Sequence, residues 1–193
     1  MELISKDGCM EVSMVADGAW AWNYILQKGF AMDGVSGTSV RRFLHEALGF
    51  DDKFIESTVR TIFLNNSPVD NLDETYIKDG DRMALGSAMP GLVGIVMGRD
   101  NFYKSFRSGI AVKDHTKSDA GPARVSMKVF STLAVESGRG LLGRGILVDA
   151  ALLAGFLREK KALFVEGDGL DADGFFAKLD GLSGFLPVRV TFA

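Results

Sequence analysis

Thr61-Ile-Phe-Leu-Asn-Asn-Ser-Pro-Val-Asp70, followed by Ile77-Lys-Asp-Gly-Asp-Arg-Met-Ala-Leu85, is the stretch on which the fold of this chain depends. Residues 59–64 and 83–85 are apolar and rich in strand-forming residues, which predicts two β-strands. Asn65-Asn-Ser-Pro68 and Lys78-Asp-Gly-Asp81 have the composition of turns, and Gly80 is available for a positive φ. The stretch therefore predicts strand, turn and strand.

The residues before this stretch predict a hairpin and a helix. Residues 10–16 and 19–26 alternate between apolar and polar positions on either side of Asp17-Gly18, a strong hairpin signal. Ser39 resembles an N-cap, residues 40–48 have helical apolar spacing, and Gly49 follows as a helix-ending glycine. The order ββαββ over residues 1–95 predicts an N-terminal β-grasp, or ubiquitin-like, domain.

In these same two stretches the chain resembles the small sulfur-carrier proteins, which include the small subunit of molybdopterin synthase and the thiamine-pathway sulfur carrier. The resemblance covers residues 39–94 and rests on the strand ending in Asn-Asn, the Val69-Asp70 pair and Lys78-Asp-Gly-Asp81 before an apolar strand. It implies the β-grasp fold. It also implies a role in sulfur or cofactor metabolism, carried out by a C-terminal Gly-Gly tail whose carboxylate becomes a thiocarboxylate.

The tail region departs from that pattern. The matching residues read Ala88-Met-Pro-Gly-Leu-Val-Gly94, without Gly-Gly and with further chain beyond them. A carrier role would need cleavage after Gly91 or Gly94 to free a carboxylate. The alternative is that Pro90, Gly91 and Gly94 form a tail-like loop that turns the chain between two domains.

A change in charge marks the second half of the chain, residues 96–193. Residues 1–95 hold 8 basic and 14 acidic residues, a net of −6, and residues 96–193 hold 14 and 11, a net of +3. We expect the second half to be a smaller mixed α+β domain, because predicted strands and helices alternate in it. Its basic residues gather in one segment: Arg99, Lys104, Arg107, Lys113, Lys117, Arg124, Lys128, Arg139 and Arg144. Either this is a solvated surface, or it is a site for an anion or an acidic partner.

A glycine-rich run in the second half fits the pattern G-x-G-x-x-G. Residues 138–143 read Gly138-Arg139-Gly140-Leu-Leu-Gly143, after a predicted strand over residues 124–136. A dinucleotide fingerprint is disfavoured, because Gly145 interrupts the following helix and too few strands remain. We favour a glycine-rich turn or hairpin. Its free N–H groups, with Arg139 and Arg144, form a candidate anion-binding loop.

The sequence contains no recognisable catalytic motif. His45 and His115 are the only histidines and Cys9 is the only thiol, so we predict no catalytic residue, no metal site and no cofactor. We expect His45 at the surface or at a boundary, and Cys9 as an inert cysteine at a strand start.

Phe102, Tyr103 and Phe106 lie beside Lys104. They are interpreted as a partly buried anchor rather than a nucleic-acid site, because the chain has a net charge of −3.

We therefore predict a non-catalytic ubiquitin-like module that binds a protein partner or a second copy of itself. An apolar sheet face that includes Trp20 or Trp22 is the expected contact surface. Without a run of about 18 apolar residues or a secretory signal, the expected location is the cytoplasm, away from membranes. The alternatives are a sulfur carrier processed near Gly91 or Gly94 and an anion or nucleotide binder at the Gly138–Gly145 loop.

Overall fold

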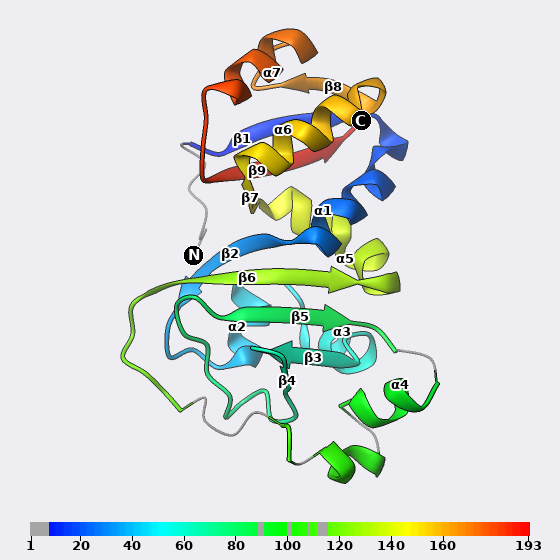
Figure 1. Cartoon of the computed structure of the whole chain (residues 1–193), viewed down its shortest axis with the longest axis vertical. Helices are drawn as coiled ribbons and strands as arrows, with labels where there is room; N and C mark the ends of the chain where they lie inside the picture. Colours follow the sequence, from blue (N-terminus) through cyan, green and yellow to red (C-terminus); the bar gives the residue numbers. More distant parts are fainter. Residues whose placement is uncertain (1–7, 89–90, 100–101, 108, 112–115) are drawn as a thin grey trace.

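The computed structural model describes residues 8–88, 91–99, 102–107, 109–111 and 116–193 (Figure 1). The described residues form one mixed sheet of nine strands together with helices, so the α+β class is confirmed. The strands are β1 (Met10–Met14), β2 (Phe30–Val35), β3 (Thr61–Leu64), β4 (Ser67–Pro68), β5 (Arg82–Gly86), β6 (Pro122–Phe130), β7 (Ile146–Asp149), β8 (Phe164–Gly167) and β9 (Phe185–Phe192). Their order across the sheet is β4-β3-β5-β6-β2-β7-β9-β1-β8.

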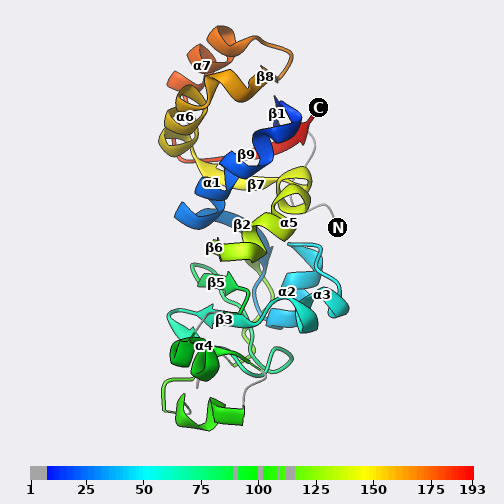
Figure 2. The same ribbon diagram turned by 90° about the vertical axis from the view of Figure 1, so that its right-hand side faces the viewer.

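The helices cover the two sides of the sheet unequally. Figures 1 and 2 together show α2, α3 and α5 on one side and α1, α6 and α7 on the other. The α-helices are α1 (Asn23–Lys28), α2 (Val40–Glu46), α3 (Asp52–Ser57), α4 (Gly91–Met97), α5 (Ser131–Arg144), α6 (Ala150–Glu159) and α7 (Ala172–Asp180), and the 3-10 helices are η1 (Ala16–Trp22), η2 (Phe102–Arg107) and η3 (Lys161–Leu163). Between α1 and α4, the side of the sheet opposite α2 and α3 is left open in both views.

Local signals placed β3, β5 and the turn before β5 correctly, but Ser67 and Pro68, which were predicted as part of a turn, form the short strand β4. β3 and β5 form an antiparallel pair, and Gly80 in the turn before β5 has a φ of 80°. Ser39 is the N-cap of α2, accepting a hydrogen bond from the N–H of Arg42 at 3.3 Å. Asp171 caps α7 in the same way, through the N–H of Gly174 at 2.9 Å. The predicted strands β3 and β5, the turn at Gly80 and the cap at Ser39 are confirmed.

The predicted hairpin around Asp17-Gly18 is wrong. After β1 the chain forms η1 and α1, so residues 19–26 are helical. Trp22, Ile25 and Leu26 are spaced as on one helix face and are fully buried, whereas Trp20 is 64% exposed. In the same segment Trp22, Ile25 and Leu26 have the helical spacing i, i+3, i+4, and all three are buried.

The strand predicted over residues 124–136 is shorter than expected, because β6 ends at Phe130 and α5 begins at Ser131. β6 lies between β5 and β2, parallel to β5 and antiparallel to β2. β6, which follows residue 95, is thus paired on both sides with strands that precede residue 95. The division of the chain into domains 1–95 and 96–193 stays a prediction.

α2 packs closely against one side of the sheet at β2. Val40, Phe43 and Leu44 are buried on α2. A Cβ at Gly34 on β2 would lie 2.8 Å from the Phe43 ring, so only glycine lets the helix approach this closely. The apolar side chains of β6, Val125, Met127 and Val129, are buried in the same core. The polar side chains of β6 therefore face the opposite, open side.

Candidate functional site

The open face of β3, β5, β6 and β2 carries the candidate site. Along β6, buried and exposed residues alternate without a break over its nine positions. Arg124, Ser126 and Lys128 are the polar side chains at the middle of the exposed set. On β5, Arg82 is exposed while Met83 and Leu85 are buried. The alternation thus sorts apolar side chains to the core and cationic ones to one surface.

A hollow of about 410 Å³ lies on this face. Small side chains, Ala84 and Ser126, are among the residues that line it on β5 and β6. Phe63 lines it from β3 and Phe185 lines it from the start of β9. Because the register pairs Phe63 with Ala84 and Ala84 with Lys128, these three residues form one row across the sheet. The hollow therefore has aromatic side chains at two ends and small residues between them.

Three cations surround the hollow. Lys28 comes from the end of α1, Arg82 from β5 and Lys128 from β6. A Cβ at Gly29 would lie 3.8 Å from Lys128 Cε, so the Lys128 stem passes close to the residue that follows Lys28. All three residues are exposed.

None of these three side chains forms an ion pair with a described residue. Asp149 is a nearby carboxylate on the rim, and it is used as the N-cap of α6, accepting from the N–H of Leu152 at 3.0 Å. Like charges close together and without counter-ions repel one another, at a small cost in stability that solvent screens. The hollow is therefore a positively charged surface whose charge the described part of the fold leaves unbalanced.

Arg124, four residues before Lys128 on β6, differs from Lys128 because it has a partner within the fold. Its guanidinium donates to both carboxylate oxygens of Asp33, at 2.8 and 3.1 Å, and lies 5.9 Å from the centre of the Phe185 ring. The hydrogen bond to Asp33 is the main reason that the pKa of Arg124 is raised. Arg124 is thus paired within the fold, whereas Lys128 is not.

Most arginines of the predicted basic segment are also used within the fold. Arg99 is buried and donates to the carbonyls of Ile55 and Val59. Arg107 is buried and pairs with Asp70. Lys113 lies outside the described residues, as does the side chain of Lys104. The segment as a whole is therefore not one basic surface, and among its described side chains Lys128 is the one that lines the hollow.

The predicted glycine-rich loop at residues 138–145 is wrong, because Gly138 to Arg144 lie inside α5. Gly138 is buried against α1, and a Cβ there would lie 3.2 Å from Leu26 Cδ1. Gly140 and Gly143 are exposed, and a Cβ at either would have no neighbour within 4 Å. In a helix the backbone N–H groups are used within the helix and do not converge on a ligand.

The two arginines of this run contact different elements. Arg139 donates to the carbonyl of Ala16 at 2.5 Å and lies 4.8 Å from the centre of the Phe192 ring. Arg144 donates to the carbonyl of Glu46 at 3.0 Å. Both guanidinium groups therefore fasten α5 to its neighbours. Anion binding by these residues stays a prediction without support from their contacts.

The predicted tail-like loop is helix, not loop, at two of its three residues. Pro90 is outside the described residues, Gly91 begins α4 with a φ of 75°, and Gly94 lies within α4. The nearby aromatic residues are not a buried anchor, which corrects that expectation: Phe102 is 90% and Phe106 is 78% exposed on η2.

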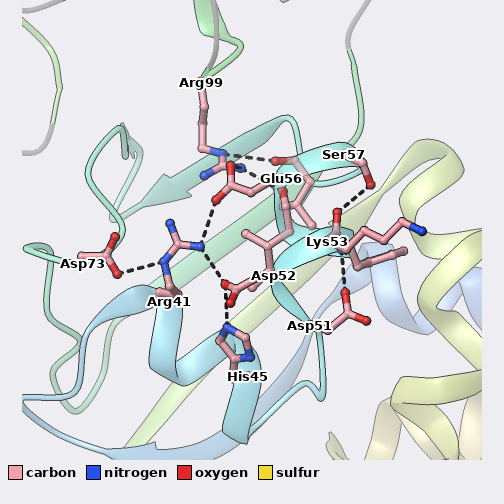
Figure 3. Close-up of polar contacts among 12 residues, drawn as sticks. Arg41, His45, Asp51, Asp52, Lys53, Glu56, Ser57, Asp73 and Arg99 are labelled. Atoms are coloured by element: carbon pink, nitrogen blue, oxygen red, sulfur yellow. Dashed lines mark hydrogen bonds and ion pairs between the residues drawn. The ribbon is translucent and has the colours of Figure 1, made fainter.

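Arg41 is the centre of a second polar cluster, on the opposite side of the sheet (Figure 3). Its guanidinium contacts Asp52 and Glu56 of α3, at 3.0 and 2.9 Å, and Asp73 of the following loop at 2.8 Å. The hydrogen bond to Asp73 is the main reason that the pKa of Arg41 is raised. Arg41, His45, Asp52, Glu56 and Asp73 are each engaged with another group of the cluster, and the cluster joins α2 to α3. We interpret it as a structural connection.

The remaining candidate chemical groups that the structure describes, Cys9 and His45, belong to different parts of the fold. His45 is partly exposed and lies 3.0 Å from Asp52, as expected for a boundary residue. Cys9 is buried before β1, and burial raises the pKa of its thiol, which disfavours the reactive thiolate. His115 lies outside the described residues. Among the residues that the structure does describe, no group of three His, Cys, Asp or Glu side chains is arranged to hold a metal ion.

Sequence reasoning missed Lys28 and Arg82 as parts of a site, although it named Lys128 within the basic segment. The available signal was local: Arg82 and Lys128 occupy polar positions in alternating strands. Their proximity depends on the pairing of β5 with β6, which residue spacing does not reveal. The predicted contact surface with Trp20 or Trp22 is not at the hollow, since Trp22 lies in the core.

No family model, curated protein sequence or solved structure matches this chain. None of the helices in the described ranges combines the length and the apolar character needed to cross a bilayer. The interpretation of the site therefore rests on its own geometry and charge.

Proposed function

We propose that this chain is a non-catalytic protein-binding module whose binding surface is the open face of a permuted β-grasp unit. The strand pairing supports the permuted unit. If β6 is placed first, the elements follow as β6, β2, α2, α3, β3, β4 and β5, which begins with a hairpin, continues with helix and ends with strands. Met127 near the end of β6 is paired with Phe30 at the start of β2, where a hairpin turn would join them.

One observation carries the binding role. Lys28, Arg82 and Lys128 surround a hollow on a sheet face that no described helix covers, and none has an anionic partner among the described residues. Exposed surfaces that combine aromatic side chains with arginine are typical of protein interfaces. Such a surface needs no catalytic group, and among the described residues Cys9 and His45 do not line it.

Site-specific photo-crosslinking in the native cells tests this role. The photoreactive residue p-benzoylphenylalanine replaces Phe63 or Phe185 at the hollow, and Val165 on β8, at the far edge of the sheet, serves as the exposed control. We expect a protein adduct of defined mass from positions 63 and 185 and none from position 165. Adducts of equal yield at all three positions, or none at the hollow, would remove the proposal.

A second candidate, the sulfur carrier, has one observation in its favour. In the permuted order β5 is the last strand, and Ser87 and Ala88 follow it directly, at the place where a carrier tail would begin. Intact-mass measurement of the untagged protein from its native cells tests this candidate. A fragment ending at Gly91 or Gly94, with one carboxylate oxygen replaced by sulfur, supports it. A full-length mass alone excludes it.

A further inference from the structure

The arrangement of groups across the open face indicates what kind of segment fits there. Phe63 belongs to β3 and Phe185 to β9, and β5, β6, β2 and β7 lie between them. The three cations come from this middle region, on α1, β5 and β6. Going across the strands, the surface therefore presents Phe63 first, then the three cations, and then Phe185.

The size of the hollow favours several side chains of one segment over a single small ion. About 410 Å³ lies within the range of sites that enclose a ligand of many atoms. An extended peptide advances about 3.3 Å per residue, so a short segment reaches from the aromatic side chain at one end to the cations at the centre and beyond.

The charge of the site decides between a peptide and a nucleic acid. Binding a nucleic acid depends on neutralising many phosphates along its backbone. Here three cations are grouped at one place, the Asp149 carboxylate lines the same hollow, and the opposite side of the sheet carries Asp52, Glu56 and Asp73 around Arg41. The whole chain has a net charge of −3. Local positive charge of this kind complements a few carboxylates, not a polyanion.

We propose that the open face binds an extended acidic peptide segment of a partner protein. Its carboxylates lie between Lys28, Arg82 and Lys128, and its flanking apolar side chains contact Phe63 and Phe185. This inference rests on the proposed binding function and adds the chemistry of the partner. Lysine and arginine donate charge-assisted hydrogen bonds to carboxylates, and the small residues Ala84 and Ser126 leave room for the acidic side chains.

Selection from a phage-displayed library of random peptides, with the full-length protein as the target, tests the inference. We expect the enriched peptides to share two or more Asp or Glu residues flanked by apolar residues. Synthetic versions labelled with fluorescein then give dissociation constants by fluorescence anisotropy. Increasing salt is expected to weaken their binding, because the contacts are ionic and near the surface.

Charge reversal locates the contact. We expect Lys128→Glu and Arg82→Glu each to weaken binding of the acidic peptides by about tenfold or more, the size expected for loss of a charged hydrogen bond. Lys53→Glu is the matched control, because Lys53 is exposed on α3 on the other side of the sheet. Lys128→Gln and Arg82→Gln, which introduce no new charge, follow if a reversed variant fails to fold by circular dichroism.

Several outcomes would overturn the inference. Enrichment of neutral or basic peptides, equal effects of Lys128→Glu and Lys53→Glu, or a library without binders would each reject an acidic segment. Concentration-dependent dimerisation that Lys128→Glu abolishes would assign the face to a second copy of the chain instead. In all these cases crosslinks from positions 63 and 185 would leave the binding function standing, whereas their absence rejects the binding function itself.

Discussion

At the scale of single residues, glycines distinguish the helix observed at residues 131–144 from the loop that the sequence suggested. Gly140 and Gly143 are exposed helical positions where a Cβ would meet nothing within 4 Å. Gly167 on β8 is the opposite case, because a Cβ there would lie 2.5 Å from ring atoms of Phe175. The same residue type is therefore dispensable at two positions and required at the third.

Alanine substitutions test this reading. We expect Gly140→Ala to raise the free energy of unfolding by about 0.5–1 kcal/mol, because alanine restricts the unfolded chain and favours the helix. Gly167→Ala is expected to lower it by about 1–3 kcal/mol through overpacking against Phe175. Urea denaturation measures both. Destabilisation by Gly140→Ala would instead indicate a glycine-requiring turn at this position.

Asp52 provides a residue-scale prediction for pH. Hydrogen bonds from His45 and from Arg41 hold the pKa of Asp52 below its usual value of 3.8. Because the folded pKa is depressed, the stabilisation is present above the unfolded pKa and is lost as pH falls through the folded pKa. We expect the stability difference between the wild type and Asp52→Asn to shrink as pH is lowered. Denaturation curves at a series of pH values measure it, and a difference independent of pH would contradict the assignment.

At the scale of elements, α3 depends on a residue distant in sequence. The helix has six residues, Asp51 caps its start, and the buried guanidinium of Arg99 donates to the Ile55 carbonyl at 2.8 Å and to the Val59 carbonyl at 3.2 Å. Carbonyls at the end of a helix have no partner within it, and a cation there is favourable. Arg99 thus completes the C-terminal end of α3.

Removing this cation is expected to destabilise the protein. We expect Arg99→Met to lower the free energy of unfolding by about 2 kcal/mol, because buried carbonyls lose a charged donor. Arg42→Met is the matched control, since Arg42 is exposed and forms only an i,i+4 pair with Glu46, worth less than about 0.5 kcal/mol. Equal effects of the two substitutions in thermal or urea denaturation would refute a special role for Arg99.

At the scale of the whole molecule, β6 is the strand on which the arrangement depends. It pairs with β5 on one side and β2 on the other, and it contributes Lys128 to the hollow. Its two neighbours belong to the first predicted half of the chain, whereas β6 belongs to the second. Without β6, β2 and β5 would each lose a ladder and expose buried apolar side chains.

A fragment ending at residue 95 tests this dependence. We expect the fragment to be unfolded, with collapsed amide dispersion in a ¹H–¹⁵N spectrum, because β2 and β5 lose their shared neighbour. The full chain under the same conditions is the control. A well-dispersed spectrum from the fragment would show that residues 1–95 form a domain by themselves.

The sequence by itself determined the features that depend on near neighbours: the α+β class, the strands β3 and β5, and the cap at Ser39. It predicted a strand at residues 19–26, where helix forms, because both periods fit so short a segment, and glycine spacing suggested a loop where α5 forms. Only the tertiary structure brought Lys28, Arg82 and Lys128 together, because their proximity comes from pairing β6 between β5 and β2. Periodicity reports which face a side chain takes, whereas the choice of strand neighbour depends on packing between residues far apart in the chain.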